Sequence, residues 1–275
     1  MKQTSNLRRR TLRVIAAAAI LLAAVFAAGL MVKPERYAVD FTIKNRPPTP
    51  AHPFGTDWLG RDMFFRTLKG LSPSMVIGLF ASLVSSLIAV ALGVMAAAAG
   101  RRTDSFILWL VDLFQGMPHL IFLIFVCILL GRGFQGIMIG VALTHWPPLT
   151  RLIRAEIISL KNRQFIISAR SLGSSALRTA IGHFTPHILP QFIVGVILMF
   201  PHAILHEAAI TFLGFGIPPE EPAIGIILSE AMRYITSGYW WLAFFPGASL
   251  LVIVLLFDRL GHNLERLLNP ASAQS

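Results

Sequence analysis

The chain has 275 residues, of which 55% are hydrophobic and only 13% are charged, and its mean hydropathy is +0.68. A soluble chain of this length could not hide so much apolar surface, so lipid must be the solvent for most of it. The net charge of +11 does not indicate a nucleic-acid-binding face, because the basic residues lie in short loops, as topology signals and contacts with anionic lipid do. The only cysteine, Cys127, lies inside an apolar run, which excludes a disulfide framework and a cysteine metal cluster.

The first apolar run is unbroken over Val14–Val32 and follows four arginines, Arg8, Arg9, Arg10 and Arg13. A helix of this length covers roughly 28 Å, about the thickness of a bilayer core. The apolar part of a secretory signal is shorter, so we expect an uncleaved anchor. The arginines predict a cytoplasmic N-terminus.

A polar stretch over 33–74 follows and contains His52-Pro-Phe-Gly-Thr-Asp-Trp-Leu-Gly-Arg-Asp62. Asp57 and Asp62 are suited to cap orphan backbone N–H groups at helix starts. We expect the residues that follow to lie on the outer lipid interface as a short amphipathic segment. Its basic side chains are expected to face water or headgroups: Arg61, Arg66 and Lys69.

Five further apolar runs predict five more membrane spans, at about 75–99, 106–130, 137–157, 188–212 and 239–260. We expect the fourth to bend at Pro147-Pro148, and a segment over 214–238 to lie outside. With six spans both chain ends face the cytoplasm, and 15 of the 24 Lys and Arg residues then lie on that side. Seven of the other nine lie in the long outer loop, which contributes less to orientation than short loops do.

A polar interruption over Arg151–Gly182 separates two of these apolar blocks. Within it Phe165, Ala169 and Leu172 recur at a helical period, and Gly173 ends the pattern before a second helical stretch. Two short helices between spans are typical of a docking surface for a soluble partner. They are equally typical of a loop that lies on the lipid surface, and the pattern alone leaves both interpretations open.

Four stretches, taken in order, resemble the dipeptide/oligopeptide/nickel family of ABC-importer permeases. The first is the outer-loop motif Phe54–Asp62. The second is the coupling loop, which contains Arg151–Glu156 and Ser168–Gly173 and runs on to His183 and Leu189-Pro190. The third is Ala208–Ile217, and the fourth is Trp240–Gly247. Together they cover about 53–270. The Gly-Thr-Asp…Leu-Gly-Arg-Asp loop is similar to that of the shorter permease subunit of a pair.

The resemblance implies an all-α membrane protein with the type I ABC importer permease fold, six transmembrane helices and cytoplasmic termini. Its parts would be the N-terminus and first helix (1–32), an outer loop with an interfacial helix (33–74), and a five-helix core (75–275) with a coupling loop at 151–187 and an outer segment at 214–238. The outer-loop motif comprises Gly55, Thr56, Asp57, Gly60, Arg61 and Asp62. The coupling residues would be Phe165, Ile166, Ala169, Arg170, Leu172 and Gly173.

The implied assembly contains a second permease subunit as heterodimer partner, two ATP-binding subunits and an extracytoplasmic solute-binding protein, in a bacterial or archaeal cytoplasmic membrane. This chain has no Gly-x-x-x-x-Gly-Lys-Ser/Thr loop, so it is not expected to be an enzyme or to bind a cofactor, and ATP-Mg would be held by the partners. One departure concerns the coupling motif, which usually begins Glu-Ala-Ala and here reads Ile167-Ser168-Ala169. The small residues of the motif would still allow docking of a partner, but the ion pair that the usual glutamate could form is not expected here.

Cargo is the least determined feature, with nickel or a metal chelate and a di- or oligopeptide as the alternatives. Of the histidines in or at spans, His119, His145, His202 and His206, we expect the last three and Glu207 to line the translocation path. His202 and His206 are four apart on one helical face and would suit transient binding of nickel, copper or zinc. Hydrogen bonding between helices, or gating, is the alternative role, and the more frequent one for such pairs.

Two other function classes are supported less well by the sequence. A proton-driven secondary transporter without an ATPase partner would need more intramembrane carboxylates than Asp112 and Glu207, and Asp112 is expected to pair with an arginine near the cytoplasmic surface. A membrane enzyme would need a catalytic constellation, and the sequence contains no recognisable one.

Overall fold

The computed structural model describes residues 2–171 and 184–268, and these are helical apart from connecting loops and one isolated bridge between Thr56 and Asp62. The α-helices are α1 (Lys2–Met31), α2 (Met63–Ala98), α3 (Arg101–Gly116), α4 (His119–Leu130), α5 (Phe134–Thr144), α6 (Pro147–Lys161), α7 (Gln164–Ser171), α9 (Thr185–Phe212), α10 (Ile224–Met232) and α11 (Trp241–Leu268). Short 3-10 turns lie at Pro34–Tyr37, Phe41–Ile43 and Ile235–Ser237.

Four of the described helices are long and apolar enough to cross a membrane: α1 from Arg8, α2, α9 and α11. A fifth crossing is possible if α3 and α4, which meet at 99°, count as one broken span. The third predicted span, 106–130, is therefore not a straight helix. The cause is Pro118, which lacks an N–H and holds Met117 in an extended conformation (φ −94°, ψ 143°).

The fourth predicted span, 137–157, is divided as well, into α5 and α6. His145 ends α5, and Pro147 lies at the start of α6, where its missing N–H costs nothing. The expected bend at Pro147-Pro148 is thus confirmed as a break between two helices. Both divided spans place non-helical backbone in the middle of an apolar run. Within a membrane, such backbone occurs only where it lines a cavity or is buried in protein.

The central helix is α2, which crosses the molecule obliquely and contacts α9, α6, α5 and α1. Its glycines allow close approach: an added Cβ at Gly78 would lie 2.7 Å from the Phe200 ring, and one at Gly93 would lie 2.8 Å from Ile153. Small residues serve this purpose between membrane helices, where no hydrophobic effect drives the helices together. The buried core therefore lies along α2.

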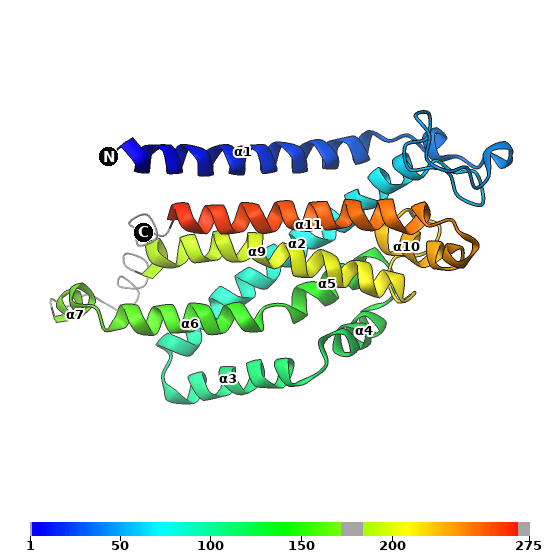
Figure 1. Cartoon of the computed structure of the whole chain (residues 1–275). Helices are drawn as coiled ribbons and strands as arrows, with labels where there is room; N and C mark the ends of the chain where they lie inside the picture. Colours follow the sequence, from blue (N-terminus) through cyan, green and yellow to red (C-terminus); the bar gives the residue numbers. More distant parts are fainter. Residues whose placement is uncertain (1, 172–183, 269–275) are drawn as a thin grey trace.

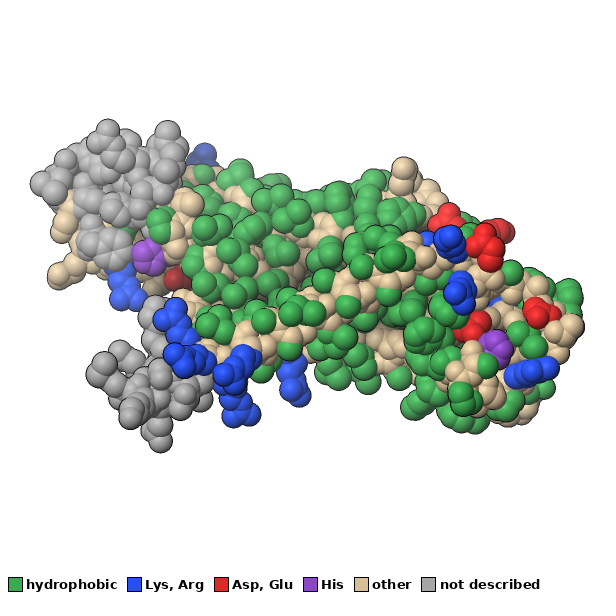
Figure 2. Space-filling model, turned by 90° about the horizontal axis from the view of Figure 1, so that it is seen from above, with side chains coloured by type: hydrophobic (Ala, Val, Ile, Leu, Met, Phe, Trp, Pro, Cys, Tyr) green, Lys and Arg blue, Asp and Glu red, His purple; other side chains and the backbone are tan. Residues whose placement is uncertain are grey.

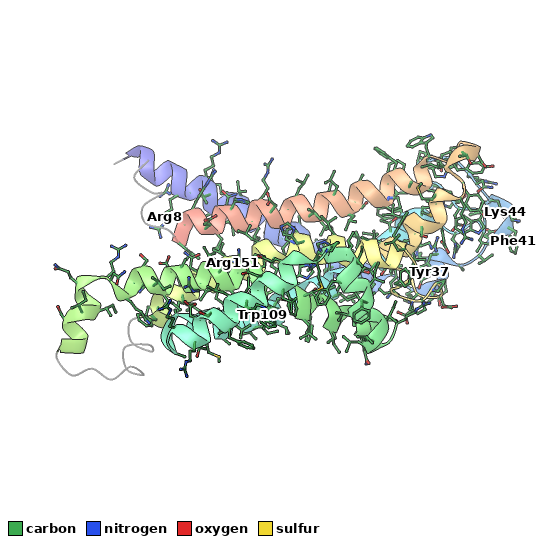
Figure 3. All side chains as sticks on the ribbon, turned by 90° about the horizontal axis from the view of Figure 1, so that it is seen from below. Arg8, Tyr37, Phe41, Lys44, Trp109 and Arg151 are labelled. Atoms are coloured by element: carbon green, nitrogen blue, oxygen red, sulfur yellow. The ribbon has the colours of Figure 1, made fainter. Side chains whose placement is uncertain are left out.

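The two ends of the molecule differ. Figure 1 places the start of α1, the end of α11 and α7 at one end, and α10 with the outer loop at the other. Hydrophobic side chains cover the length between them, and Lys and Arg side chains gather at the α7 end (Figure 2). Arg8 and Arg151 lie toward that end, whereas Tyr37, Phe41 and Lys44 lie at the opposite one (Figure 3). An apolar sheath with polar ends is the surface of a membrane-embedded protein.

Candidate translocation and coupling sites

A cavity with a volume of about 670 Å³ lies between the α3–α4 bend, the α5–α6 break and α9. Its wall is mostly apolar, and most of the polar groups come from three places: the α3–α4 bend, the α5–α6 break and α9. They include Gln115, His119, His145, Gln191, His202 and His206. Glu265 of α11 also lines it, so the cavity extends toward the α7 end of the molecule.

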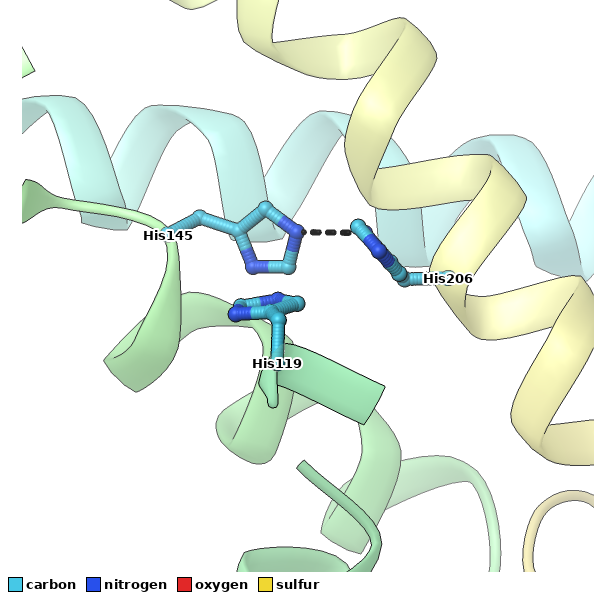
Figure 4. A group of neighbouring side chains, drawn as sticks. All are labelled: His119, His145 and His206. Atoms are coloured by element: carbon cyan, nitrogen blue, oxygen red, sulfur yellow. Dashed lines mark hydrogen bonds between the residues drawn. The ribbon is translucent and has the colours of Figure 1, made fainter. Parts of the chain in front are cut away.

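Three histidines meet in this cavity: His119, His145 and His206, here called the three-histidine cluster (Figure 4). One ring nitrogen of each lies within 4.8 Å of the others. His145 Nε2 and His206 Nδ1 form a hydrogen bond of 3.0 Å, and the His119 ring lies 4.7 Å and 4.5 Å, centroid to centroid, from those of His145 and His206.

The broken spans explain why these rings meet. His119 is the first residue of α4 directly after Pro118, and His145 is the residue at which α5 ends. Both therefore project from helix ends in the middle of the apolar layer toward the continuous helix α9, which carries His206. In an unbroken third or fourth span, the direction of each of these side chains would follow only from its position along the helix.

The tautomer of His145 is set by its surroundings. Its Nδ1 lies 2.8 Å from the carbonyl oxygen of Val141, which can only accept, so Nδ1 carries the proton and Nε2 carries the lone pair. Thr144 Oγ1 lies 3.2 Å from the same Nδ1. The His145 ring is buried and held in one orientation, and its Nε2 lone pair accepts the hydrogen bond from His206 Nδ1–H.

The predicted path residues are divided by the structure. His145 and His206 line the cavity together, and His202 lines it too, but as an exposed side chain outside the three-histidine cluster. Glu207 is fully buried within the protein, where its Oε1 accepts a 3.0 Å hydrogen bond from Thr211. Its Oε2 has no partner among the described residues.

His119 is the cluster member that sequence reasoning did not select. It is separated from His145 by 26 positions and from His206 by 87, so no helical period connects them. The available signal was Pro118 directly before it and Pro147 just after His145, since prolines in apolar runs mark helix breaks.

The outer-loop motif folds around a buried carboxylate. Asp57 is completely buried and accepts hydrogen bonds from the backbone N–H groups of Leu59 and Arg61 and from both arginine side chains, Arg61 (2.6 Å) and Arg66 (3.3 Å). Arg66 also donates to Glu230 of α10 at 2.5 Å. The expectation that Arg66 faces water or headgroups is wrong: the side chain is 3% exposed because it links the outer loop to α10.

The other motif residues hold this loop against the helices. Asp62 caps α2 by accepting from the N–H groups of Phe64 and Phe65, as expected, and also contacts His52 Nδ1 at 2.7 Å. Gly55 and Gly60 both have positive φ, and at Gly60 an added Cβ would collide with the carbonyl of Asp40. Thr56 is buried, with its carbonyl accepting from Trp241 Nε1 at 3.3 Å. No separate interfacial helix forms, since α2 already begins at Met63.

The helix predicted around Phe165 is present as α7, which projects beyond the ends of the long helices (Figure 1). Ile166 is fully buried in a group that includes Ile157, Leu160 and Phe184, so it anchors α7, whereas Ile167 is 52% exposed. Phe165, Ala169 and Arg170 lie on α7, but their side chains are outside the described part; Leu172 and Gly173 are outside the described residues altogether.

Ion pairs connect α3 to α6 near the same end. Arg151 contacts Asp112, which confirms the expected arginine partner, and Arg154 Nε lies 2.5 Å from Asp104 Oδ1. The Asp112 carboxylate is 62% exposed, so the pair with Arg151 lies on the outside of the helix bundle. It is part of a surface pair and not of a buried relay.

Several apolar helices of spanning length, with two predicted spans that are each divided into two helices beside a cavity, define a multi-pass membrane protein. The chain belongs to the family described as the binding-protein-dependent transport system inner membrane component, which matches residues 89–270. It is thus a permease subunit of an ABC importer of the inner membrane. This membership gives no support to the proton-driven alternative.

Two relatives of this chain are named as peptide permeases. The chain is 32% identical over 229 residues to the dipeptide transport system permease protein DppC of Bacillus subtilis (strain 168), covering 83% of this chain and 72% of that protein. It is 30% identical over 251 residues to the oligopeptide transport system permease protein OppC of the same organism, covering 91% and 82%.

Among solved structures, the chain is similar to a chain of the MetNI methionine ABC transporter in inward-facing conformations, with a TM-score of 0.63. The similarity covers 75% of this chain and 98% of that one at 14% sequence identity, so it shows a shared fold. The type I importer permease fold is therefore confirmed.

Proposed function

We propose that this chain is one of two permease subunits of an ATP-driven importer whose cargo is a di- or oligopeptide, delivered by an extracytoplasmic solute-binding protein. The observation that carries the proposal is the 32% identity to a dipeptide permease over 83% of the chain. The cavity suits such a cargo chemically, because an apolar wall with a few polar groups accommodates side chains while orienting a polar backbone.

The energy enters, in this proposal, through α7. The ATP and its magnesium ion are bound by separate subunits, and α7 inserts into a cleft of one of them. Ile166 fixes α7 to the end of α6, so a displacement of α7 is passed to α6 and to the α5–α6 break beside the cavity. The exposed position 167 carries no charge, so this docking depends on apolar and small side chains.

The membrane topology that fits this assignment has six crossings, with α3–α4 and α5–α6 each making one bent crossing. Both termini, the 99–101 turn and α7 then lie in the cytoplasm of a bacterial or archaeal cell, and the outer loop faces the binding protein. The basic side chains at the α7 end have the positions that a cytoplasmic surface favours.

The coupling proposal is tested by Gly173→Arg, with Ser105→Arg, an exposed small residue of α3 at the same end, as the matched control. A large charged side chain at Gly173 is expected to block docking, so peptide-stimulated ATP hydrolysis and uptake fall to background while the subunit still inserts. The control is expected to retain both. Normal uptake and stimulation in Gly173→Arg would refute the docking assignment.

A metal ion or metal chelate is the second candidate cargo, and the three-histidine cluster is the observation that favours it. The whole complex, purified with its binding protein, is analysed by mass spectrometry and by metal analysis. Co-purifying peptides without metal support the first candidate, and nickel or a chelator in stoichiometric amount supports the second.

A further inference from the structure

We propose that His119, His145 and His206 form a binding site for one divalent late first-row transition-metal ion, with nickel, copper and zinc as the suitable class. This inference goes beyond the proposed peptide permease and rests on it only in placing the site on the translocation path. It differs from the expectation for His202 and His206, since His202 lies outside the cluster.

The distances are close to those that a shared ion requires. Nitrogens at about 2.1 Å from one ion lie roughly 3 to 3.4 Å apart. His145 Nε2 and His206 Nδ1 are already 3.0 Å apart, and the three ligand atoms lie within 4.8 Å of one another. In the ion-free protein His206 Nδ1–H donates to His145 Nε2, so ion binding requires His206 to change to the tautomer with its proton on Nε2. A rotation of the His119 ring, which no hydrogen bond at Nε2 restrains, then completes the set.

Hydrogen-bonding groups around the cluster match those of a metal site. His145 Nδ1–H donates to the Val141 carbonyl, which leaves Nε2 as the ligand atom and fixes the plane of the ring. Metal-binding histidines are usually oriented by such a bond from the other ring nitrogen. The ring is therefore preorganised before any ion arrives.

His119 supplies a second observation that points to a ligand. Its Nε2 is buried and has no hydrogen-bond partner among the described residues, although a buried polar atom without a partner is costly. Ordinary packing between helices would leave this atom unpaired, whereas coordination to an ion shared with His145 and His206 would satisfy it.

The cluster has an open side. All three histidines line the cavity of about 670 Å³. An ion with three imidazole ligands has at least one coordination position left for water or for a donor atom of a passing ligand. The same chemistry therefore serves a free ion or an ion carried by an amino-acid or peptide chelator.

The test uses the assembled transporter in detergent, titrated with Ni²⁺ alone and with Ni²⁺ plus equimolar L-histidine. We expect one ion per copy of this chain, and His119→Gln, His145→Gln and His206→Gln each to weaken binding at least about tenfold, since loss of an outer partner alone costs that much. His187→Gln, at an exposed histidine of α9 that does not line the cavity, is the control and should bind as the parent does. Tight binding only with the chelator present identifies a chelate as the ligand, and tight binding without it identifies the free ion.

X-ray absorption on the nickel-loaded parent gives a second readout, with imidazole nitrogens at about 2.1 Å expected. Unchanged affinity in a triple glutamine variant, or no imidazole signal, would overturn the site. If a variant fails to assemble, His119→Gln still decides, because its Nε2 makes no hydrogen bond to lose. Failure of the site leaves peptide-stimulated ATP hydrolysis intact, whereas failure of the proposed permease function removes that stimulation and leaves metal binding unchanged.

Discussion

Single side chains decide how the outer loop is joined to the membrane helices. Asp57, Arg61, Arg66 and Glu230 form one connected ion-pair group between the loop and α10. A buried arginine is costly unless its charge is compensated, and here two carboxylates compensate it. At the loop's exposed edge, hydrogen bonds from the Thr42 side chain and backbone lower the pKa of Asp40 below its ordinary value.

Arg66→Ala is expected to destabilise the assembled protein by roughly 3 kcal/mol, the low end for a broken buried pair, because Glu230 is partly exposed. The measurement is the apparent Tm of the purified complex in detergent. Lys69→Ala, a partly exposed position one turn further along α2, is the control and should leave the Tm within error. Equal effects of the two substitutions would contradict the role assigned to the Arg66 ion pairs.

At the scale of elements, glycines determine how closely α2 can approach its neighbours. Gly93 lies against α6, where an added Cβ would be 2.8 Å from Ile153 Cγ2 and 3.0 Å from the Thr150 carbonyl oxygen. The backbone oxygen cannot move away without disturbing α6. This contact connects the central helix to the helix that leads to α7.

Gly93→Ala is therefore expected to cost about 1 to 3 kcal/mol, as overpacking of a close contact does, and to lower ATP-coupled uptake. Gly247→Ala in α11 is the matched control, because its Cβ would meet only Leu228 Cδ2 at 3.7 Å, an ordinary contact. The readouts are the apparent Tm and the uptake rate of the complex. A stable, fully active Gly93→Ala variant would show that α2 and α6 can separate without consequence.

At the scale of the whole molecule, the orientation of the two ends determines which partner each one meets. The only cysteine, Cys127, is buried, so the parent protein is expected to give little reaction with a membrane-impermeant maleimide. Exposed serines at the two ends, Ser105 on α3 and Ser237 after α10, provide positions for single added cysteines.

We expect Ser237→Cys to be labelled in intact cells and Ser105→Cys only after the membrane is opened. The reason is that α3 starts toward the basic α7 end of the molecule, which the proposed topology places in the cytoplasm. Labelling is measured by the mass shift of the subunit. The reverse pattern would invert the topology and place α7 outside, which would end the coupling proposal.

Much of the architecture follows from the sequence alone. Apolar runs of spanning length give the membrane class, Asp62 marks the start of α2, and the period around Phe165 gives a helix that the structure shows as α7. These features are local, since each depends on residues within a few turns of one another. The ordered motifs likewise give the family that the comparison confirms.

Only the tertiary structure decided what depends on distant residues. It broke the spans at Pro118 and Pro147, buried Arg66 between Asp57 and Glu230, directed Glu207 into the protein interior and brought His119 to His145 and His206. Helical period fixes which face a side chain occupies, but not which other helix that face meets. That choice belongs to the packing of α4 and α5 against α9, which brought the three histidines together beside the cavity.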